Sequence, residues 1–324
     1  MQAIVCHKYG PPSDLVLSEI PSPEAKAGEV VIEVHAAGVN FPDALLVQGL
    51  YQVKPPLPFS PGVEVAGVVR AVGPGVDHPR VGERVAAMVM GGFAEHAVAR
   101  ASSTVALPDD IDFVTAASLT LTYGTAYHAL VGRADLQPGE WLFVTGAGGG
   151  VGTAAVDLGK ALGAHVVAAA GSESKREAAR ALGADVVVDA NAPDLVDILK
   201  RVTDGGIDVA LDNVGGAQFD AALRAARWRA RLLVVGFASG TIPSIPANRA
   251  LLRELDIRGV YFGAWAERHP HAMQANFGQI FTLLRNKNIA PRVAESYAFA
   301  DAPLAIADLL ERRLIGKGVV HVRA

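Results

Sequence analysis

Short runs of alternating apolar and polar residues fill the first third of the chain. Residues 29–34 alternate as a half-buried strand does, and residues 63–72, 84–89 and 95–99 are further apolar runs. Glycine and proline punctuate these runs, with prolines at positions 55, 56, 58 and 61. The pattern predicts an all-β barrel or sandwich over residues 1–122.

From residue 123 onward the hydrophobic pattern changes to strands alternating with helices. Alternation of this kind predicts an α/β domain with a doubly wound parallel sheet. The expected strands are residues 141–145, 165–170, 185–189, 207–212, 231–236 and 256–261. The expected helices between them are residues 151–163, 175–182, 193–202 and 216–226.

The last part of the chain reads differently again. Helices are expected near residues 272–287 and 302–312, and a final strand at 318–322. No helix follows that strand, so we expect the chain to return to the first domain and complete it. The resulting prediction is a β domain at 1–122, completed by 265–324, and an α/β domain at 123–264.

A glycine loop joins the first α/β strand to its helix. Glycines at 146, 149 and 152 follow the apolar strand 141–145 and open the helix at 151, which leads into a second strand. Glycine permits a tight turn and close approach to a pyrophosphate, and the helix N-terminus offers free N–H groups. The loop lacks the Lys-Ser/Thr of a P-loop, so a dinucleotide is favoured over a nucleoside triphosphate.

The end of the second strand predicts which dinucleotide binds. NAD sites usually carry an acid at this strand tip, whereas here the strand ends Ala169-Ala170-Gly171. Ser172, Lys175 and Arg176 follow, and these side chains suit a 2′-phosphate. Glu173 weakens the argument, and a solvated first helical turn is the alternative reading. We expect NADPH as the cofactor.

Composition and charge exclude several classes of protein. The 324 residues are 51% hydrophobic, which suits two globular domains, and the net charge of −4 does not favour nucleic-acid binding. We see neither an N-terminal signal sequence nor an apolar run long enough for a membrane span. The only cysteine, Cys6, fits a cytoplasmic location.

Together the motifs resemble the zinc-free quinone oxidoreductase (zeta-crystallin-like) branch of the medium-chain dehydrogenase/reductases. The matching segments are AGVNFPD (37–43), PGVEVAG (61–67), VGERV (81–85), TAY (125–127), GGGVG (148–152), LGAD (182–185) and DNVGG (212–216). The resemblance spans nearly the whole chain. It implies a GroES-like β-barrel domain followed by a Rossmann domain.

The resemblance also bears on the metal. Zinc-dependent relatives place Cys where Asn40 stands and His where Val63 stands, and they carry a four-cysteine lobe that this chain lacks. We therefore expect no metal. Without zinc to stabilise an alkoxide, hydride donation to an electron-poor acceptor is the easier reaction.

The resemblance further implies the residues that bind NADPH. The glycine loop is expected to bind the pyrophosphate, and the start of the next helix is expected to bind the 2′-phosphate. Residues of both domains would contact the nicotinamide, and residues at strand ends would make further contacts. The expected cofactor-binding residues are Asn40, Thr125, Gly149, Gly150, Val151, Gly152, Ser172, Lys175, Arg176, Asn213, Phe237, Phe262, Gly263 and Lys317. A structural role is the alternative for Asn40, Phe237, Phe262 and Lys317.

Three residues are candidates for the chemical step. Asn40 could bind the substrate oxygen, and Tyr51 or Tyr127 could donate a proton, although Tyr127 lies in an apolar helical run typical of core packing. Some relatives have Tyr at the position of Leu45, which cannot donate a hydrogen bond. Either a hydroquinone anion takes its proton from water, or another group supplies it.

The expected function is NADPH:quinone reduction without zinc. Two alternatives stay open: an enoyl or acryloyl thioester reductase acting on an activated C=C bond, and an NADPH-binding protein with a structural or regulatory role. The family resemblance implies a homodimer, and the apolar strand at 256–261 is the candidate for edge pairing.

Overall fold

The computed structural model describes residues 1–323, which form two compact units. Unit 1 comprises residues 1–121, 265–277 and 292–323, and unit 2 comprises residues 122–264 and 278–291. All of 265–324 was expected in the first domain, whereas residues 278–291 belong to unit 2. Residue 324 lies outside the described residues.

Unit 1 is built around one long strand, β3 (Glu29–Val39), that pairs with three others. It runs antiparallel to β4 (Glu64–Val72) and β15 (Lys317–His321), and its first half also pairs with β6 (His96–Arg100). Along residues 1–323 the sheet has the order β14-β15-β3-β4-β5-β7. The outer strands are β5 (Arg84–Met88), β7 (Thr104–Ala106) and β14 (Val293–Ala298), and β1 (Gln2–Val5) forms a hairpin with β2 (Val16–Glu19).

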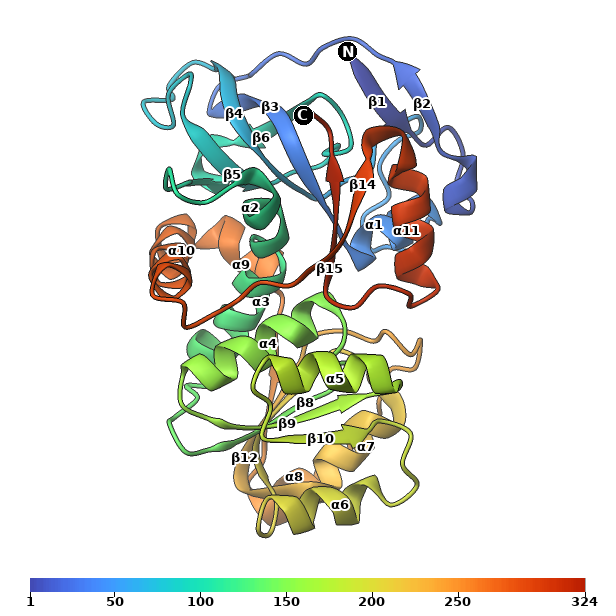
Figure 1. The fold of residues 1–324 in the computed structure, drawn as a ribbon, viewed down its shortest axis with the longest axis vertical. Coiled ribbons are helices and arrows are strands. Elements are labelled where there is room, and N and C mark those ends of the chain that lie inside the picture. Colours follow the sequence, from blue (N-terminus) through green and yellow to red (C-terminus); the bar gives the residue numbers. More distant parts are fainter. Residues whose placement is uncertain (324) are drawn as a thin grey trace. The chain divides into compact units, whose positions relative to one another are not determined.

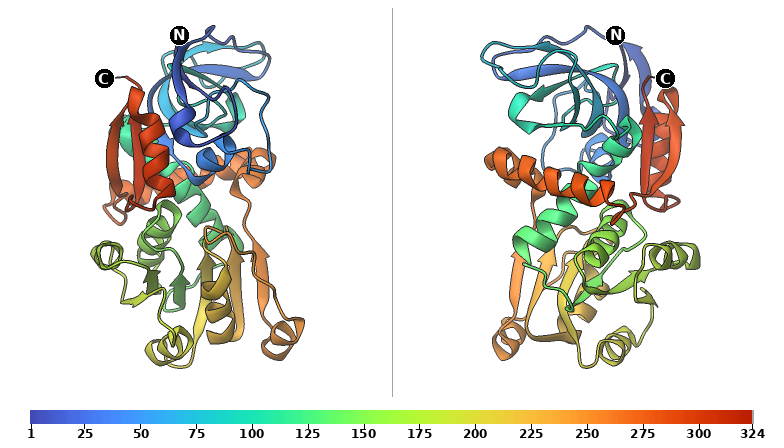
Figure 2. Two further views of the ribbon diagram at one scale, coloured as in Figure 1. Left: turned by 90° about the vertical axis from the view of Figure 1, so that its right-hand side faces the viewer. Right: turned by 60° about the vertical axis from the view of Figure 1, so that its left-hand side comes forward.

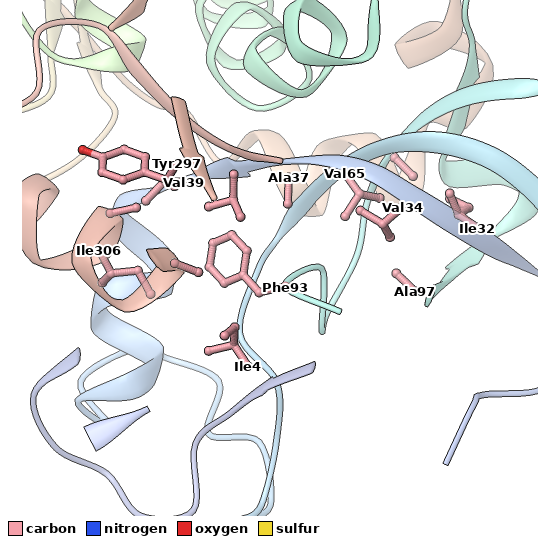
Figure 3. Packing of buried hydrophobic residues seen from close by; sticks show 14 of the residues in the cluster. Ile4, Ile32, Val34, Ala37, Val39, Val65, Phe93, Ala97, Tyr297 and Ile306 are labelled. Atoms are coloured by element: carbon pink, nitrogen blue, oxygen red, sulfur yellow. The ribbon is translucent and has the colours of Figure 1, made fainter. Parts of the chain in front are cut away.

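The alternation of β3 places its apolar side chains on the core face. Val30, Ile32 and Val34 are fully buried there, while Glu33 and His35 point to the opposite face. Figure 3 shows how Phe93, which is also fully buried, fills the cluster between Ile4 and the strands.

Residues 292–323 complete unit 1 with two strands and a helix. Gly318 of β15 is aligned with Val39 of β3, and β14 runs parallel to β15 on its other side. Helix α11 (Ala302–Leu310) connects these two strands and packs beside them, which the red segments of Figure 2 show in both views.

Unit 2 contains the predicted parallel sheet. Within the described chain its six strands have the order β10-β9-β8-β11-β12-β13, and all neighbours are parallel (Figure 1). The strands are β8 (Trp141–Val144), β9 (His165–Ala170), β10 (Val186–Asp189), β11 (Ile207–Asp212), β12 (Ala226–Val234) and β13 (Asp256–Gly259). This is the Rossmann strand order. From β8 the chain adds strands first on one side of the sheet and then, starting with β11, on the other, and open α/β sheets bind ligands at this switch point.

Helices cover both faces of this sheet. On one face lie α4 (Gly150–Ala161) and α5 (Glu173–Ala181), and on the other lie α6 (Leu195–Val202) and α7 (Gly216–Ala225) (Figure 1). Leu199 of α6 and Phe219 of α7 are fully buried against Phe143 of β8. Such burial on both faces explains why the strands read as continuous apolar runs.

The other helices lie between the strands along the chain. They are α1 (Phe41–Val47), α2 (Phe113–Leu119), α3 (Thr122–Tyr127), α8 (Ala247–Arg253), α9 (Phe262–Arg268) and α10 (Pro270–Arg285), with a π-helix, η3 (His128–Arg133), and short 3-10 helices η1 (Pro12–Asp14), η2 (Ala101–Ser103) and η4 (Phe299–Asp301). Across the described part of the chain, the helices are too short or too polar to span a bilayer.

Candidate active site

Three polar side chains contact one another in the interior of unit 1. Asn40 follows β3, Glu64 begins β4 and Lys317 begins β15, and at most 5% of each residue is exposed. Lys317 Nζ lies 2.6 Å from Glu64 Oε2 and also donates a hydrogen bond to Asn40 Oδ1. Asn40 Nδ2 donates to Glu64 Oε2 and to the carbonyl oxygen of Gly38, both at 3.0 Å. These contacts fix the orientation of the Asn40 amide.

Glu64 also binds a backbone group from a third part of unit 1. Its other oxygen, Oε1, accepts a hydrogen bond from the backbone N–H of Leu121 at 2.6 Å. Leu121 lies just beyond α2, so a single carboxylate connects the ends of β3, β15 and the α2 segment. Further hydrogen bonds offset the cost of burying an ion pair, and here Asn40 and the N–H of Leu121 supply them.

Gly38 leaves the space that this network needs. A Cβ atom on Gly38 would lie 2.5 Å from Glu64 Oε2, 2.9 Å from Lys317 Cε and 2.2 Å from the carbonyl oxygen of Ala117. Any larger residue would therefore push apart the ion pair or α2.

Asp43 accepts hydrogen bonds from two backbone N–H groups, those of Asn40 and Gly62. Its Oδ2 accepts from the N–H of Asn40 at 2.8 Å, the carboxylate contact of a capping box at the start of α1, and its Oδ1 accepts from the N–H of Gly62 at 3.0 Å. Asp43 is fully buried. Burial raises the pKa of Asp43 to about 7, against the opposing effects of the two N–H groups and of Lys317.

In unit 2 the glycine loop lies at the N-terminus of α4, as predicted. The backbone N–H of Thr153 donates to Gly149 O at 2.8 Å, so the N–H groups of Gly150, Val151 and Gly152 precede the first intrahelical hydrogen bond. A Cβ on Gly152 would lie 2.1 Å from Gly146 O, so glycine is required for the helix to begin this close to the loop. The loop therefore has the backbone geometry of an anion-binding site.

The ends of β8 and β11 are tied together beside this loop. Thr145 Oγ1 donates to Asp212 Oδ1 at 2.6 Å, and the N–H of Asn213 donates to Thr145 Oγ1 at 3.0 Å. Asp212 Oδ2 accepts from the N–H of Gly215 at 2.9 Å. Burial raises the pKa of Asp212, while its hydrogen bonds with Thr145 and Gly215 act in the opposite direction. The predicted residue Asn213 is thus held at the switch point of the sheet.

The predicted 2′-phosphate residues gather where β9 meets α5. Ser172 is the N-cap of α5, and its Oγ accepts from the N–H of Lys175. The aliphatic stem of Lys175 lies over Gly148, because a Cβ on Gly148 would come within 2.6–2.8 Å of it. Arg176 is engaged differently, with NH1 donating to Ala170 O at 3.2 Å and Nε donating to Glu173 at 2.9 Å.

The remaining predicted site residues lie outside the hydrogen-bond networks described above. Thr125 and Tyr127 are buried in α3, and burial raises the pKa of the Tyr127 hydroxyl. In unit 2 the buried Phe262 lies at the start of α9, next to Gly263. Phe237 is partly exposed and lies near Gly215, whose added Cβ would be 3.3 Å from its ring. In unit 1, Tyr51 is half-buried in the irregular segment after α1.

Four residues of these two networks were not predicted as site residues: Asp43, Glu64, Thr145 and Asp212. One signal was present, because Asn40 and Asp43 have the N-cap to N3 spacing of a capping box. The other contacts join residues far apart in the sequence, and local patterns carry no information about them. Among the residues that the structure describes, no three His, Cys, Asp or Glu side chains form a group that could hold a metal ion.

The buried ion pair makes a prediction about stability. Lys317→Met should lower the free energy of unfolding by about 3–5 kcal/mol, because it leaves the Glu64 carboxylate buried and unpaired. Urea unfolding followed by circular dichroism would measure the change. Lys8→Met is the matched control, since Lys8 is 75% exposed in its pair with Asp14 and such pairs contribute about 0–1 kcal/mol. Equal losses in the two variants would contradict the prediction.

Asp43 makes a prediction about pH. Its folded-state pKa of about 7 lies above the ordinary value of 3.8, so between these values the folded chain holds a proton that the unfolded chain has released. The free energy of unfolding should therefore fall as pH rises from about 4 to 7, by up to about 4 kcal/mol from this group.

Replacing Asp43 tests whether this residue causes the loss of stability as pH rises. Asp43→Asn should flatten the decline in urea midpoint between pH 5 and pH 7, whereas the exposed Asp77→Asn should keep the parent slope. A parent slope retained in Asp43→Asn would disprove the assignment.

Two family models match the chain. The alcohol dehydrogenase GroES-like domain matches residues 26–109, and the zinc-binding dehydrogenase domain matches residues 150–276. They lie mostly within the two segments predicted as the GroES-like and Rossmann domains, and the combined fold class is confirmed.

Similar proteins and structures cover almost the whole chain. The quinone oxidoreductase-like protein 2 homolog of Nematostella vectensis is 34% identical over 99% of this chain and 89% of its own length, and the human quinone oxidoreductase is 35% identical over 80% of each. The structure of Escherichia coli quinone oxidoreductase complexed with NADPH matches with 28% identity and a TM-score of 0.91, over 99% of this chain and 100% of that one. A mycobacterial protein complexed with NADPH matches with 30% identity and a TM-score of 0.92, over 99% of both chains. With this fold and this degree of identity, the chain belongs to the quinone oxidoreductase family of the medium-chain dehydrogenase/reductases.

Proposed function

We propose that this protein is an NADPH-dependent reductase that transfers a hydride to quinones without zinc. The observation that carries the proposal is the environment of Asn40. At the position where zinc-dependent relatives have a cysteine ligand, this chain has an amide bound between Lys317 and Glu64. This position thus supplies neither the charge nor the free thiolate that a catalytic zinc requires.

The residues of unit 2 fit NADPH. The N–H groups of Gly150, Val151 and Gly152 would bind the pyrophosphate, and Ser172 and Lys175 would bind the 2′-phosphate, with Gly149 shaping the loop. Two similar structures are complexes with NADPH, which supports the same cofactor here. When bound, the cofactor supplies the hydride. Further contacts are proposed for Thr125, Asn213, Phe237, Phe262 and Gly263.

In unit 1, Lys317 and Asn40 can still bind a ligand. The ammonium of Lys317 has three N–H groups, and within residues 1–323 two of them are used, by Asn40 and Glu64. Both Asn40 amide hydrogens are committed to protein acceptors, so Asn40 would act through the remaining lone pair of Oδ1. In this proposal Lys317 donates to a ligand oxygen, and Asn40 accepts from a ligand N–H.

Hydride transfer without zinc is easiest to an electron-poor acceptor. Metal-assisted oxidoreductases use the ion as a Lewis acid to stabilise oxygen charge. A quinone needs less help, because its conjugated ring spreads the negative charge that the hydride brings. Tyr51 and Tyr127 are proposed proton donors. Burial raises the pKa of Tyr127 and makes it a weaker acid.

A substrate panel tests the proposal. NADPH oxidation should be measured with small quinones and, in parallel, with enoyl-CoA thioesters. Turnover of quinones would support the proposal, and no turnover with any quinone at saturating NADPH would reject it. Much faster turnover of enoyl thioesters would instead favour C=C reduction. Tight NADPH binding without turnover of either class would favour a structural or regulatory role.

We also propose a homodimer that forms at the free edge of the unit 2 sheet. β13 ends the sheet, and in the left view of Figure 2 it is the outermost strand, in orange. Leu251 and Leu252 of the preceding helix α8 are 77% and 70% exposed. Light scattering of the Leu251→Glu/Leu252→Glu variant should show a monomer if this edge pairs, and an unchanged dimer would exclude it.

The 2′-phosphate role of Lys175 gives a direct prediction. Lys175→Ala should weaken NADPH binding about tenfold or more and leave NADH binding nearly unchanged, because a charge-assisted hydrogen bond contributes about 1.5–3 kcal/mol. Isothermal titration with each cofactor would measure both affinities. The exposed Lys200→Ala on α6 is the control for loss of one positive charge. Equal losses for NADPH and NADH would rule the role out.

A further inference from the structure

The start of α5 combines one acidic and three basic side chains. Glu173 occupies the first helical position, and Lys175, Arg176 and Arg180 follow within two turns. Residues three and seven positions after Glu173 share its helix face, whereas a residue two positions after it does not. Glu173 therefore faces Arg176 and Arg180, and Lys175 faces elsewhere.

Glu173 bonds both arginines. Its Oε2 accepts from Arg176 Nε at 2.9 Å and lies 2.8 Å from Arg176 NH2, and its Oε1 accepts from Arg180 NH1 at 2.7 Å. The hydrogen bonds with Arg180 and Arg176 lower the pKa of the Glu173 carboxyl, which therefore stays ionised near neutral pH.

The third nitrogen of Arg176 is also directed at the protein. NH1 donates to the carbonyl oxygen of Ala170, the last residue of β9, and lies 3.6 Å from Asp189 Oδ1 at the end of β10. Only 18% of the Arg176 side chain is exposed. Its guanidinium thus lies at the strand end where the 2′-phosphate is expected, but all three nitrogens face protein acceptors.

Lys175 is held in a different direction. Its Cβ, Cγ and Cδ atoms lie over Gly148 of the glycine loop, on the side of the helix away from the Glu173 pairs. Of the two cations that the sequence predicted for the phosphate, the structure places Lys175 at the loop and keeps Arg176 with Glu173.

We propose that Glu173 is a specificity-determining residue that limits the preference for NADPH over NADH by restraining Arg176. This inference rests on the proposed function, in which Ser172 and Lys175 bind the 2′-phosphate. Loss of the carboxylate releases Nε and NH2 of Arg176, which then donate to the phosphate from the end of β9. NADH has no 2′-phosphate and gains nothing from the released guanidinium.

The test compares two glutamates on one helix. Glu173→Ala should tighten NADPH binding about tenfold, the value of one new charge-assisted hydrogen bond, and should leave NADH within twofold. Glu177→Ala removes the same charge one turn further along α5, at an exposed position, and should leave both affinities within twofold. Isothermal titration with NADPH and with NADH gives all four values.

A double variant separates release of Arg176 from simple removal of a negative charge. Glu173→Ala/Arg176→Ala should lose the gain, and a gain that persists would overturn the inference, as would weaker or unchanged NADPH binding in Glu173→Ala. A parent protein without preference for NADPH that also gains none in Glu173→Ala would overturn the proposed cofactor as well. A parent that prefers NADPH and responds to Lys175→Ala, but not to Glu173→Ala, would overturn this inference alone.

Discussion

The buried ion pair between Lys317 and Glu64 is the interaction on which the organisation of unit 1 depends. Neither charge can remain in the interior without the other, so β15 and β4 must both be in place before either side chain is stable. Asn40 completes the pair, since its amide bonds both partners. The same contacts that stabilise the unit therefore also fix the orientation of the residue proposed to meet the ligand.

Unit 2 also contains a buried carboxyl group, and its hydrogen-bond partners are neutral. Asp212 is almost fully buried, and Thr145 and the backbone beyond β11 supply its hydrogen bonds. The carboxyl ends of β8 and β11 are thereby held in register at the switch point of the sheet. In both units a buried carboxylate binds the backbone of the loop that the proposed ligand would approach, so the loops are ordered by the core rather than by the ligand.

The sequence predicted best those elements whose pattern is reinforced by burial on both faces. The bounds of β9 and β11 agree with the expected strands, because their apolar runs end at turns. β14 was missed because its apolar pattern is weak. Among the strands that the structure describes it pairs only with β15, and much of its surface is exposed. The glycine loop lies at the start of α4, where local signals predicted it. The sequence placed Arg176 with the phosphate and treated Glu173 only as a weakness, so it did not predict their pairing.

The position of Lys317 has a consequence for how the protein matures in the cell. Glu64 and Asn40 are synthesised early, but their partner is added only when the ribosome has nearly finished the described chain. Until then unit 1 contains a carboxylate without its counter-ion, while the strands of unit 2 are already available to pair. A nascent or prematurely terminated chain should therefore expose an unfinished β domain to chaperones and proteases, so that only chains that contain β15 acquire a complete site.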